Sequence, residues 1–243
     1  MTEDDPFFVG YLPAPRAVQF FALSMIATLV FGFAALALTI GRTPADVEAA
    51  HYGEDLDIAG VLVAHPYPLV VAPADAAHPQ GRAIMLAADG KHGVQEFADA
   101  LDGRAVEAKG VLVKRGSLDM LILGADDVKG GAPASAPTAT PLGRWRISGE
   151  ICDGKCASGG MAPGAGLSHK ACANLCVAGG LPPVLVASGP VEGARYLLLA
   201  DSAGAPTPDI ADLVARPVTL EGAVERLGDM LVFRVDWPKA HAP

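Results

Sequence analysis

Two stretches of the sequence share one pattern: LDGRAVEAKGVLVKRGSLDMLIL (101–123) and LVARPVTLEGAVERLGDMLVF (213–233). Both follow the frame L-x2-R-x-V-x3-G, and after a short loop both continue with D-M-L. Apolar and polar residues alternate within each stretch over runs of four to eight, which is typical of half-buried strands. Each stretch therefore predicts the last hairpin of a small β barrel, with Gly110 and Gly222 at kinks or bulges.

The similarity extends toward the N-terminal side of both stretches. Three short strand-like segments precede each hairpin, and a short helix is possible between the third and the fourth strand: Gly93–Leu101 in the first copy and Thr207–Val214 in the second. Five matching segments in the same order indicate a duplication. The paired short segments are Ile58–Leu62 with Ile147–Ile151, Pro68–Ala72 with Pro183–Ala187, and Gly81–Gly90 with Ala194–Gly204.

The order β-β-β-α-β-β resembles an OB-type fold, although an SH3-like barrel or a split sandwich has strands of similar length. The predicted fold class is mainly β, with one N-terminal transmembrane helix followed by two tandem small β-barrel (OB-like) domains. The second domain carries a helical insert with cysteines and a histidine. The expected parts are an N-terminal tail (1–16), the transmembrane helix (17–40), the first domain (50–129), a Pro/Ala/Gly linker (130–143) and the second domain (144–238) with its insert (152–181).

Residues 17–40 contain no charged side chain. At about 1.5 Å per residue a helix of this length spans roughly 36 Å, enough to cross a hydrocarbon core of about 30 Å. The run is longer than that of a cleaved signal peptide, and the preceding segment is acidic rather than basic. A short N-terminal tail before a large domain favours a signal anchor, with membrane lipid contacting residues 17–40. The predicted location is the bacterial inner membrane, single-pass, with the soluble part in the periplasm.

All four cysteines lie in the segment where the second copy is longer than the first. Gly60 is followed after 8 residues by Pro68, whereas the matching Gly149 is followed after 34 residues by Pro183. Such a long loop in a compact unit is usually functional or stabilised by its own cross-links. Its second half predicts a helix, with Ser168 as a cap and Gly179 at the end.

On that helix His169, Cys172 and Cys176 follow the spacing i, i+3 and i+7, so they share one face. An Asp-Gly turn is expected to bring Cys152 and Cys156 toward each other, and a glycine-rich strap carries Met161. Three interpretations remain open: a zinc or copper ion bound by these residues, two disulfides, or a redox-active dithiol or bound organic cofactor. The thioether of Met161 would suit copper(I) in particular.

The motif K-C-x4-M-x-P-G-x-G-x2-H-x2-C-x3-C, starting at Lys155, resembles a motif of uncharacterised membrane-anchored bacterial proteins. These proteins also have a stretch like FFVGYLP (7–13) before the anchor. The resemblance implies a motif of Cys156, Met161, His169, Cys172 and Cys176, with Cys152 outside it. Three cysteines with one histidine suit a metal better than two disulfides, so the resemblance favours the metal site.

The net charge of −9 argues against a nucleic-acid partner, whose phosphates attract basic surfaces. The sequence contains no catalytic-triad pattern, Walker loop or dinucleotide fingerprint, so nothing in it favours an enzyme. The turn Asp89–Gly93 is expected to be an ordinary hairpin turn with His92 exposed, and His65 and Tyr67 are expected in a rigid turn. The prediction is an accessory, assembly or electron-transfer component of a membrane complex. A disulfide-stapled adaptor and, less favoured, a thiol oxidoreductase are the alternatives.

Overall fold

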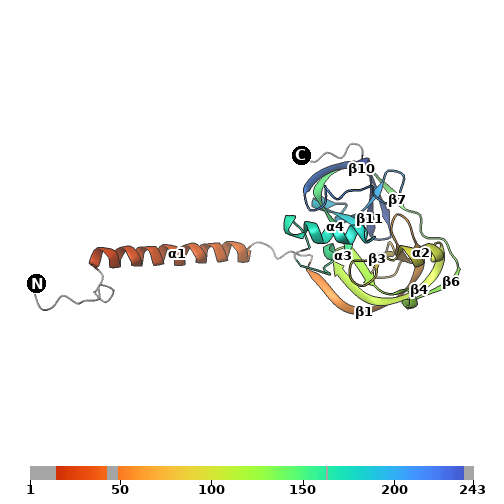
Figure 1. Ribbon diagram of the computed structural model, residues 1–243, viewed down its shortest axis with the longest axis horizontal. Helices are drawn as coiled ribbons and strands as arrows, with labels where there is room; N and C mark the ends of the chain where they lie inside the picture. Colours follow the sequence, from red (N-terminus) through yellow and green to blue (C-terminus); the bar gives the residue numbers. More distant parts are fainter. Residues whose placement is uncertain (1–14, 43–48, 163, 238–243) are drawn as a thin grey trace, which may run out of the picture. The chain divides into compact units, whose positions relative to one another are not determined.

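The computed structural model describes residues 15–42, 49–162 and 164–237. The chain divides between residues 47 and 48 into two units, which are described separately. The first unit contains helix α1 (Arg16–Arg42; Figure 1). Within it Arg16–Leu38 has a mean hydropathy of 2.3 and is long and apolar enough to cross a membrane, a property that a signal sequence shares. The helix predicted over residues 17–40 is therefore present, whereas most of the predicted tail lies outside the described residues.

The second unit begins with a ring of five strands. These are β1 (Ala50–Val63), β2 (Leu69–Ala72), β3 (Arg82–Ala87), β4 (Arg104–Arg115) and β5 (Leu118–Ile122). Their neighbour order is β1-β2-β3-β5-β4, and β4 pairs back onto β1, so the ring is closed. Only β3 and β5 run parallel. Helix α2 (Gln95–Leu101) connects β3 to β4, where the sequence predicts a short helix.

A second ring follows the same plan. It consists of β7 (Thr140–Asp153), β8 (Pro183–Val191), β9 (Ala194–Asp201), β10 (Pro217–Leu227) and β11 (Met230–Val235). The strands form a closed barrel in the order β7-β8-β9-β11-β10, and β9 and β11 are its parallel pair. The predicted mainly-β fold with two small barrels and a helical insert in the second is confirmed.

Two local predictions differ from the structure. The segment 130–143, predicted as a linker, is partly strand. Its first residues belong to β6 (Val128–Pro133), which pairs with β4, and its last residues begin β7. Residues 134–139 between the two strands are in neither helix nor strand. The segment Thr207–Val214 forms turns instead of a helix. Its carbonyl groups at positions 211, 212 and 214 accept hydrogen bonds from Lys170 Nζ, which replaces the pairing that a helix would provide internally.

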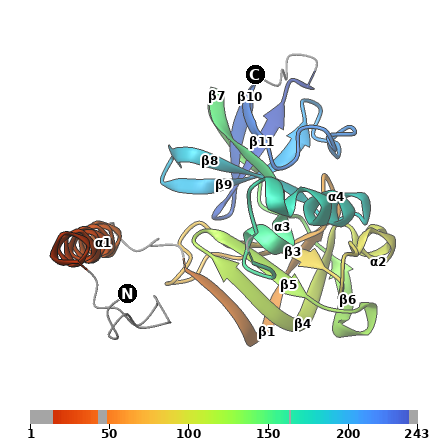
Figure 2. The ribbon, with the colours of Figure 1, turned by 60° about the vertical axis from the view of Figure 1, so that its left-hand side comes forward.

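The two barrels share an apolar core. Side chains of β2, β3 and β5 pack with side chains of β8, β9 and β11 in one buried cluster, apart from the clusters inside each barrel. Strands β3 and β5 are therefore buried along nearly their whole length, which explains their continuous apolar runs where alternation was expected. Cys152, Cys156 and Cys176 belong to this shared cluster. Figure 2 shows α3 (Gly154–Ala157) and α4 (Lys170–Ala178) beside the junction of the two sheets.

Gly110 and Gly222 occupy matching positions in the two barrels, and neighbouring backbone explains both. A Cβ atom on Gly222 would lie 2.0 Å from the carbonyl oxygen of Arg234, and one on Gly110 would lie 2.3 Å from that of Ile122. We expect Gly222→Ala to lower the free energy of unfolding by about 1–3 kcal/mol, because the strands must move apart. Denaturant unfolding measures the change. Gly189→Ala is the control, since nothing lies within 4 Å of its added Cβ, and equal stability of the two variants would contradict the prediction.

Candidate metal centre

The insert that carries the cysteines is made of two short helical segments joined by a glycine-rich strap. Strand β7 ends at Asp153, which is the N-cap of α3 and accepts a hydrogen bond from the backbone N–H of Cys156 at 2.9 Å. The strap then passes close to α3: Gly164 has φ +68, and a Cβ there would lie 2.8 Å from the carbonyl oxygen of Cys156. Only glycine fits this approach without strain.

The second segment begins one residue later than predicted. A 3₁₀ turn (Leu167–His169) leads into α4, and His169 rather than Ser168 stands at the N-cap position. The helix ends as predicted at Gly179. Gly180 has φ +89, its N–H bonds the carbonyl of Val177, and the N–H of Leu181 bonds the carbonyl of Cys176. This pair of hydrogen bonds is a Schellman motif, which fixes the C-terminal end of the helix beside the sulfur of Cys176.

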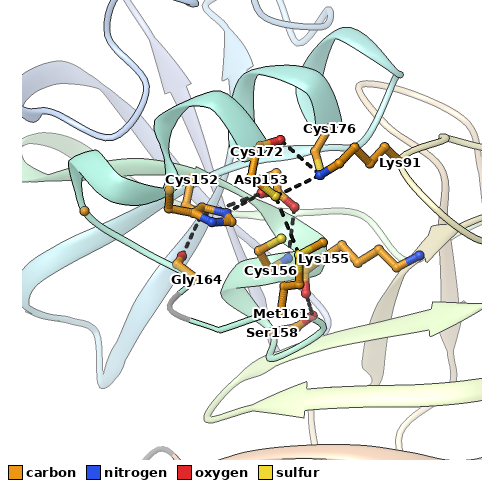
Figure 3. A network of polar contacts seen from close by, with 12 residues as sticks. Lys91, Cys152, Asp153, Lys155, Cys156, Ser158, Met161, Gly164, Cys172 and Cys176 are labelled. Carbon is orange, nitrogen blue, oxygen red and sulfur yellow. Dashed lines mark hydrogen bonds and ion pairs between the residues drawn. The ribbon is translucent and has the colours of Figure 1, made fainter.

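The donor atoms of the insert lie close together (Figure 3). One group consists of Cys156, His169 and Cys172, whose sulfurs and ring nitrogen are all within 4.8 Å of one another, and a second joins Asp153, Cys156 and Cys176 within the same limit. Cys156 belongs to both groups. Ligand atoms around one tetrahedral zinc ion are separated by roughly 3.5 Å, so small side-chain rotations would bring three sulfurs and an imidazole into one coordination sphere.

The imidazole of His169 faces the interior of this cluster. The side chain is 3% exposed, and Nε2 lies 3.2 Å from Oδ2 of Asp153, which is itself fully buried. A carboxylate bound to one ring nitrogen orients the ring and leaves the other nitrogen for a metal ion. Many metal-bound histidines have their other ring nitrogen bound by a carboxylate in this way.

Cys156 and Cys176 form a hydrogen-bonded pair of thiols. The bond from Cys156 lowers the pKa of Cys176 to about 7, and the ammonium group of Lys91 contributes further to this effect. Cys156, as the donor, has its pKa raised by the same bond and by burial. Cys176 is therefore about half thiolate near neutral pH, and the thiolate is the form that binds metals and reacts with disulfides.

Cys152 and Met161 lie at the edge of the cluster. Cys152 groups with Asp153 and His169, but its thiol donates a hydrogen bond of 2.8 Å to the carbonyl oxygen of Gly164, and burial raises its pKa. An Asp-Gly turn is predicted to bring Cys152 and Cys156 toward each other, and in the structure the two sulfurs belong to different groups of donor atoms. The thioether sulfur of Met161 lies 3.7 Å from the sulfur of Cys172.

Lys91 was not among the predicted site residues. It belongs to the Asp89–Gly93 turn of the first barrel, and its Nζ lies 2.8 Å from the sulfur of Cys172 and 3.5 Å from that of Cys176. The contact with Cys172 raises the pKa of Lys91. The turn that was expected to have only a structural role thus reaches the cysteines, while His92 is exposed as predicted.

Lys155 makes the reverse connection. Its Nζ donates to the carbonyl oxygens of Ala88 and Gly90 at 2.8 and 3.0 Å. A lysine from each barrel therefore forms hydrogen bonds with residues of the other barrel. In Figure 3 its ammonium group points away from the sulfurs. A hydrogen bond from the N–H of Gly93 to the carbonyl of Gly179 joins the same two segments. The first barrel therefore closes one side of the cluster.

The other candidates from the sequence have different surroundings. Tyr67 lies in the shared core, and its hydroxyl contacts the Thr207 hydroxyl at 3.0 Å. His65 is largely exposed and lies 3.8 Å from a carboxylate oxygen of Asp99. All four cysteines are free thiols in the structure, so neither of the pairings needed for two disulfides is formed.

Among the described residues, then, the cluster combines three sulfurs, an imidazole and an orienting carboxylate, with a lysine supplied by the other barrel. Soft and borderline cations such as Cu(I) and Zn(II) prefer such donors. Comparison of the chain with protein-family models, with curated proteins and with solved structures finds no match.

Proposed function

We propose that the protein is a membrane-anchored accessory, assembly or electron-transfer component that binds one metal ion in its second barrel. Cys156, Cys172 and Cys176 supply thiolates, and His169 supplies an imidazole nitrogen. The observation that carries the proposal is the gathering of these donors around a buried carboxylate, within 4.8 Å in each group. Negative charge in a buried site is costly, so a set of thiolates beside a carboxylate is most stable when a cation neutralises it.

The surroundings of the donors also suit a bound cation. Three thiolates and Asp153 carry four negative charges, while Lys91 and Lys155 carry two positive ones. A divalent ion would balance this charge, and a monovalent ion would balance it if one thiol kept its proton. Asp153 would hold His169 in the orientation that a ligand needs.

The location is part of the proposal. Helix α1 is proposed as a signal anchor in a bacterial inner membrane, with residues 48–243 in the periplasm and other subunits of a membrane complex as partners. The apolar length of the helix supports this assignment. We propose as well that the motif from Lys155 to Cys176 relates the chain to uncharacterised membrane-anchored bacterial proteins. We also propose that the two barrels arose by duplication, because both have the same strand order and the same parallel pair.

A second candidate function is thiol redox chemistry. The hydrogen bond between Cys156 and Cys176, together with the lowered pKa of Cys176, is the arrangement expected of a reactive dithiol. Two disulfides among the four cysteines would instead give a stapled adaptor that binds no metal. The reactive dithiol and the stapled adaptor differ in their content of free thiols, and the metal centre differs from both in its content of metal.

The test is metal analysis of the full chain purified in detergent without chelator or reducing agent, with a count of free thiols after metal removal. We expect about one metal ion per chain and four reactive thiols. His169→Ala should lose the ion, whereas His92→Ala should keep it, because His92 is exposed and outside the cluster. Absence of metal together with absence of thiols would establish the stapled adaptor, and absence of metal with reversible oxidation of two thiols would establish the dithiol.

A further inference from the structure

The donor residues of the cluster differ in their exposure to solvent. Cys156 and Cys176 are each 1% exposed and His169 is 3% exposed, whereas Cys172 is partly exposed. Among these four donors, Cys172 is therefore the one that a cation from solvent reaches first. The exposed edge of the cluster is where exchange with solvent or with another molecule has to begin.

Met161 lies at that edge. Its side chain is 44% exposed, and its sulfur is 3.7 Å from the sulfur of Cys172. Within residues 49–162 and 164–237 only four large apolar side chains are exposed, and three of them belong to the insert: Met161, Leu167 and Leu175. Packing does not account for an exposed methionine whose sulfur is directed toward a thiol.

A thioether distinguishes one class of cation from another. It is a neutral, soft donor that binds Cu(I) and Ag(I), while Zn(II) prefers thiolate, imidazole and carboxylate ligands. A neutral ligand also releases an ion more readily than a thiolate does, because no charge separation opposes the release. Met161 is therefore suited to receive a soft ion and to pass it to Cys172.

We propose that Met161 and Cys172 form an exchange port through which a soft monovalent cation of the Cu(I) class enters and leaves the metal centre. The inference rests on the proposed metal-binding function and narrows it to an ion that is transferred. The ion contacts the Met161 thioether first, then the Cys172 sulfur, and then the buried donors Cys156, Cys176 and His169. Each sulfur ligand that still carries a proton releases it to solvent as it binds the ion, and no donor is oxidised.

Lys91 completes the port on its other side. Its ammonium group donates a hydrogen bond of 2.8 Å to the Cys172 sulfur and places a positive charge beside it. The same sulfur thus contacts a fixed positive charge from the first barrel and a soft neutral donor from the strap. An incoming cation takes over the charge balance that Lys91 provides.

The test is the rate at which the full-length protein, loaded with Cu(I) under anaerobic conditions, transfers the ion to excess bicinchoninate. We expect Met161→Leu, which removes the sulfur and keeps the size, to slow the transfer about 10-fold, while Zn(II) transfer to a zinc chelator keeps the wild-type rate. Leu167→Ala is the matched control, since it removes an exposed apolar side chain of the same insert without removing a sulfur. It should leave both rates unchanged.

Three results would overturn the port: equal Cu(I) rates in wild type and Met161→Leu, equal slowing for Zn(II), or equal slowing in Leu167→Ala. Each of these results would be compatible with the proposed metal centre. Binding of Zn(II) without Cu(I) would likewise refute the port and retain the centre. Wild-type protein that binds neither ion would refute the proposed function, and the port with it.

Discussion

Asp153→Ala should lower the free energy of unfolding by about 2–4 kcal/mol in metal-free, reduced protein. The side chain is fully buried and accepts from the N–H of Cys156, so its loss removes the N-cap of α3, which costs about 1 kcal/mol. It also leaves the His169 ring without its carboxylate partner in a buried position, which costs about 1–3 kcal/mol. Denaturant unfolding followed by tryptophan fluorescence measures the change.

Asp153→Asn is the matched variant, because asparagine caps helices as well as aspartate does. We expect it to retain most of the stability and to weaken metal binding by about 10- to 100-fold, since the amide orients His169 less strongly than a carboxylate. Competition with a chelator of known affinity measures the change in metal affinity. If Asp153→Ala were as stable as wild type, or Asp153→Asn bound metal equally well, Asp153 would not have the central position that its contacts indicate.

Much of the fold could be predicted because the chain repeats one pattern. The matching positions of Gly110 and Gly222 identified the final hairpin of each barrel, and the length difference between Gly60–Pro68 and Gly149–Pro183 located the insert. Helical spacing correctly placed Cys172 and Cys176 on one helix, beside His169. Each of these signals is a pattern within a short segment or a match between two such segments. Such patterns can be recognised without knowledge of the tertiary contacts.

The contacts that were missed are long-range. Lys91 reaches Cys172 across 81 residues, and nothing in the pattern around the Asp89–Gly93 turn reports that contact. Asp153 was interpreted as part of an Asp-Gly turn, and turns and N-caps favour the same residue, so the local sequence does not separate them. The continuous apolar runs of β3 and β5 did indicate that a second layer covers these strands, because a strand that is buried on both faces has no polar alternation.

The largest effect on affinity is expected from Cys156→Ala. Apparent binding energies of structural zinc sites are about 10–16 kcal/mol, so each of four ligands contributes about 2.5–4 kcal/mol, or about 100- to 1000-fold in affinity. Cys156 should reach the upper end of that range, because its sulfur belongs to both donor groups and hydrogen-bonds Cys176. Competition with a chelator, at fixed pH and in the presence of a non-binding reductant, measures the loss.

Cys152→Ala provides the comparison within the same insert. Both thiols are 1% exposed, but the Cys152 thiol donates to the carbonyl oxygen of Gly164 instead of contacting the other sulfurs. Its removal should therefore change the affinity by less than about 5-fold, with a loss of about 1 kcal/mol in stability for the unpaired carbonyl. A loss of affinity for Cys152→Ala as large as that for Cys156→Ala would contradict this assignment and would make the sulfur of Cys152 a ligand of the ion as well.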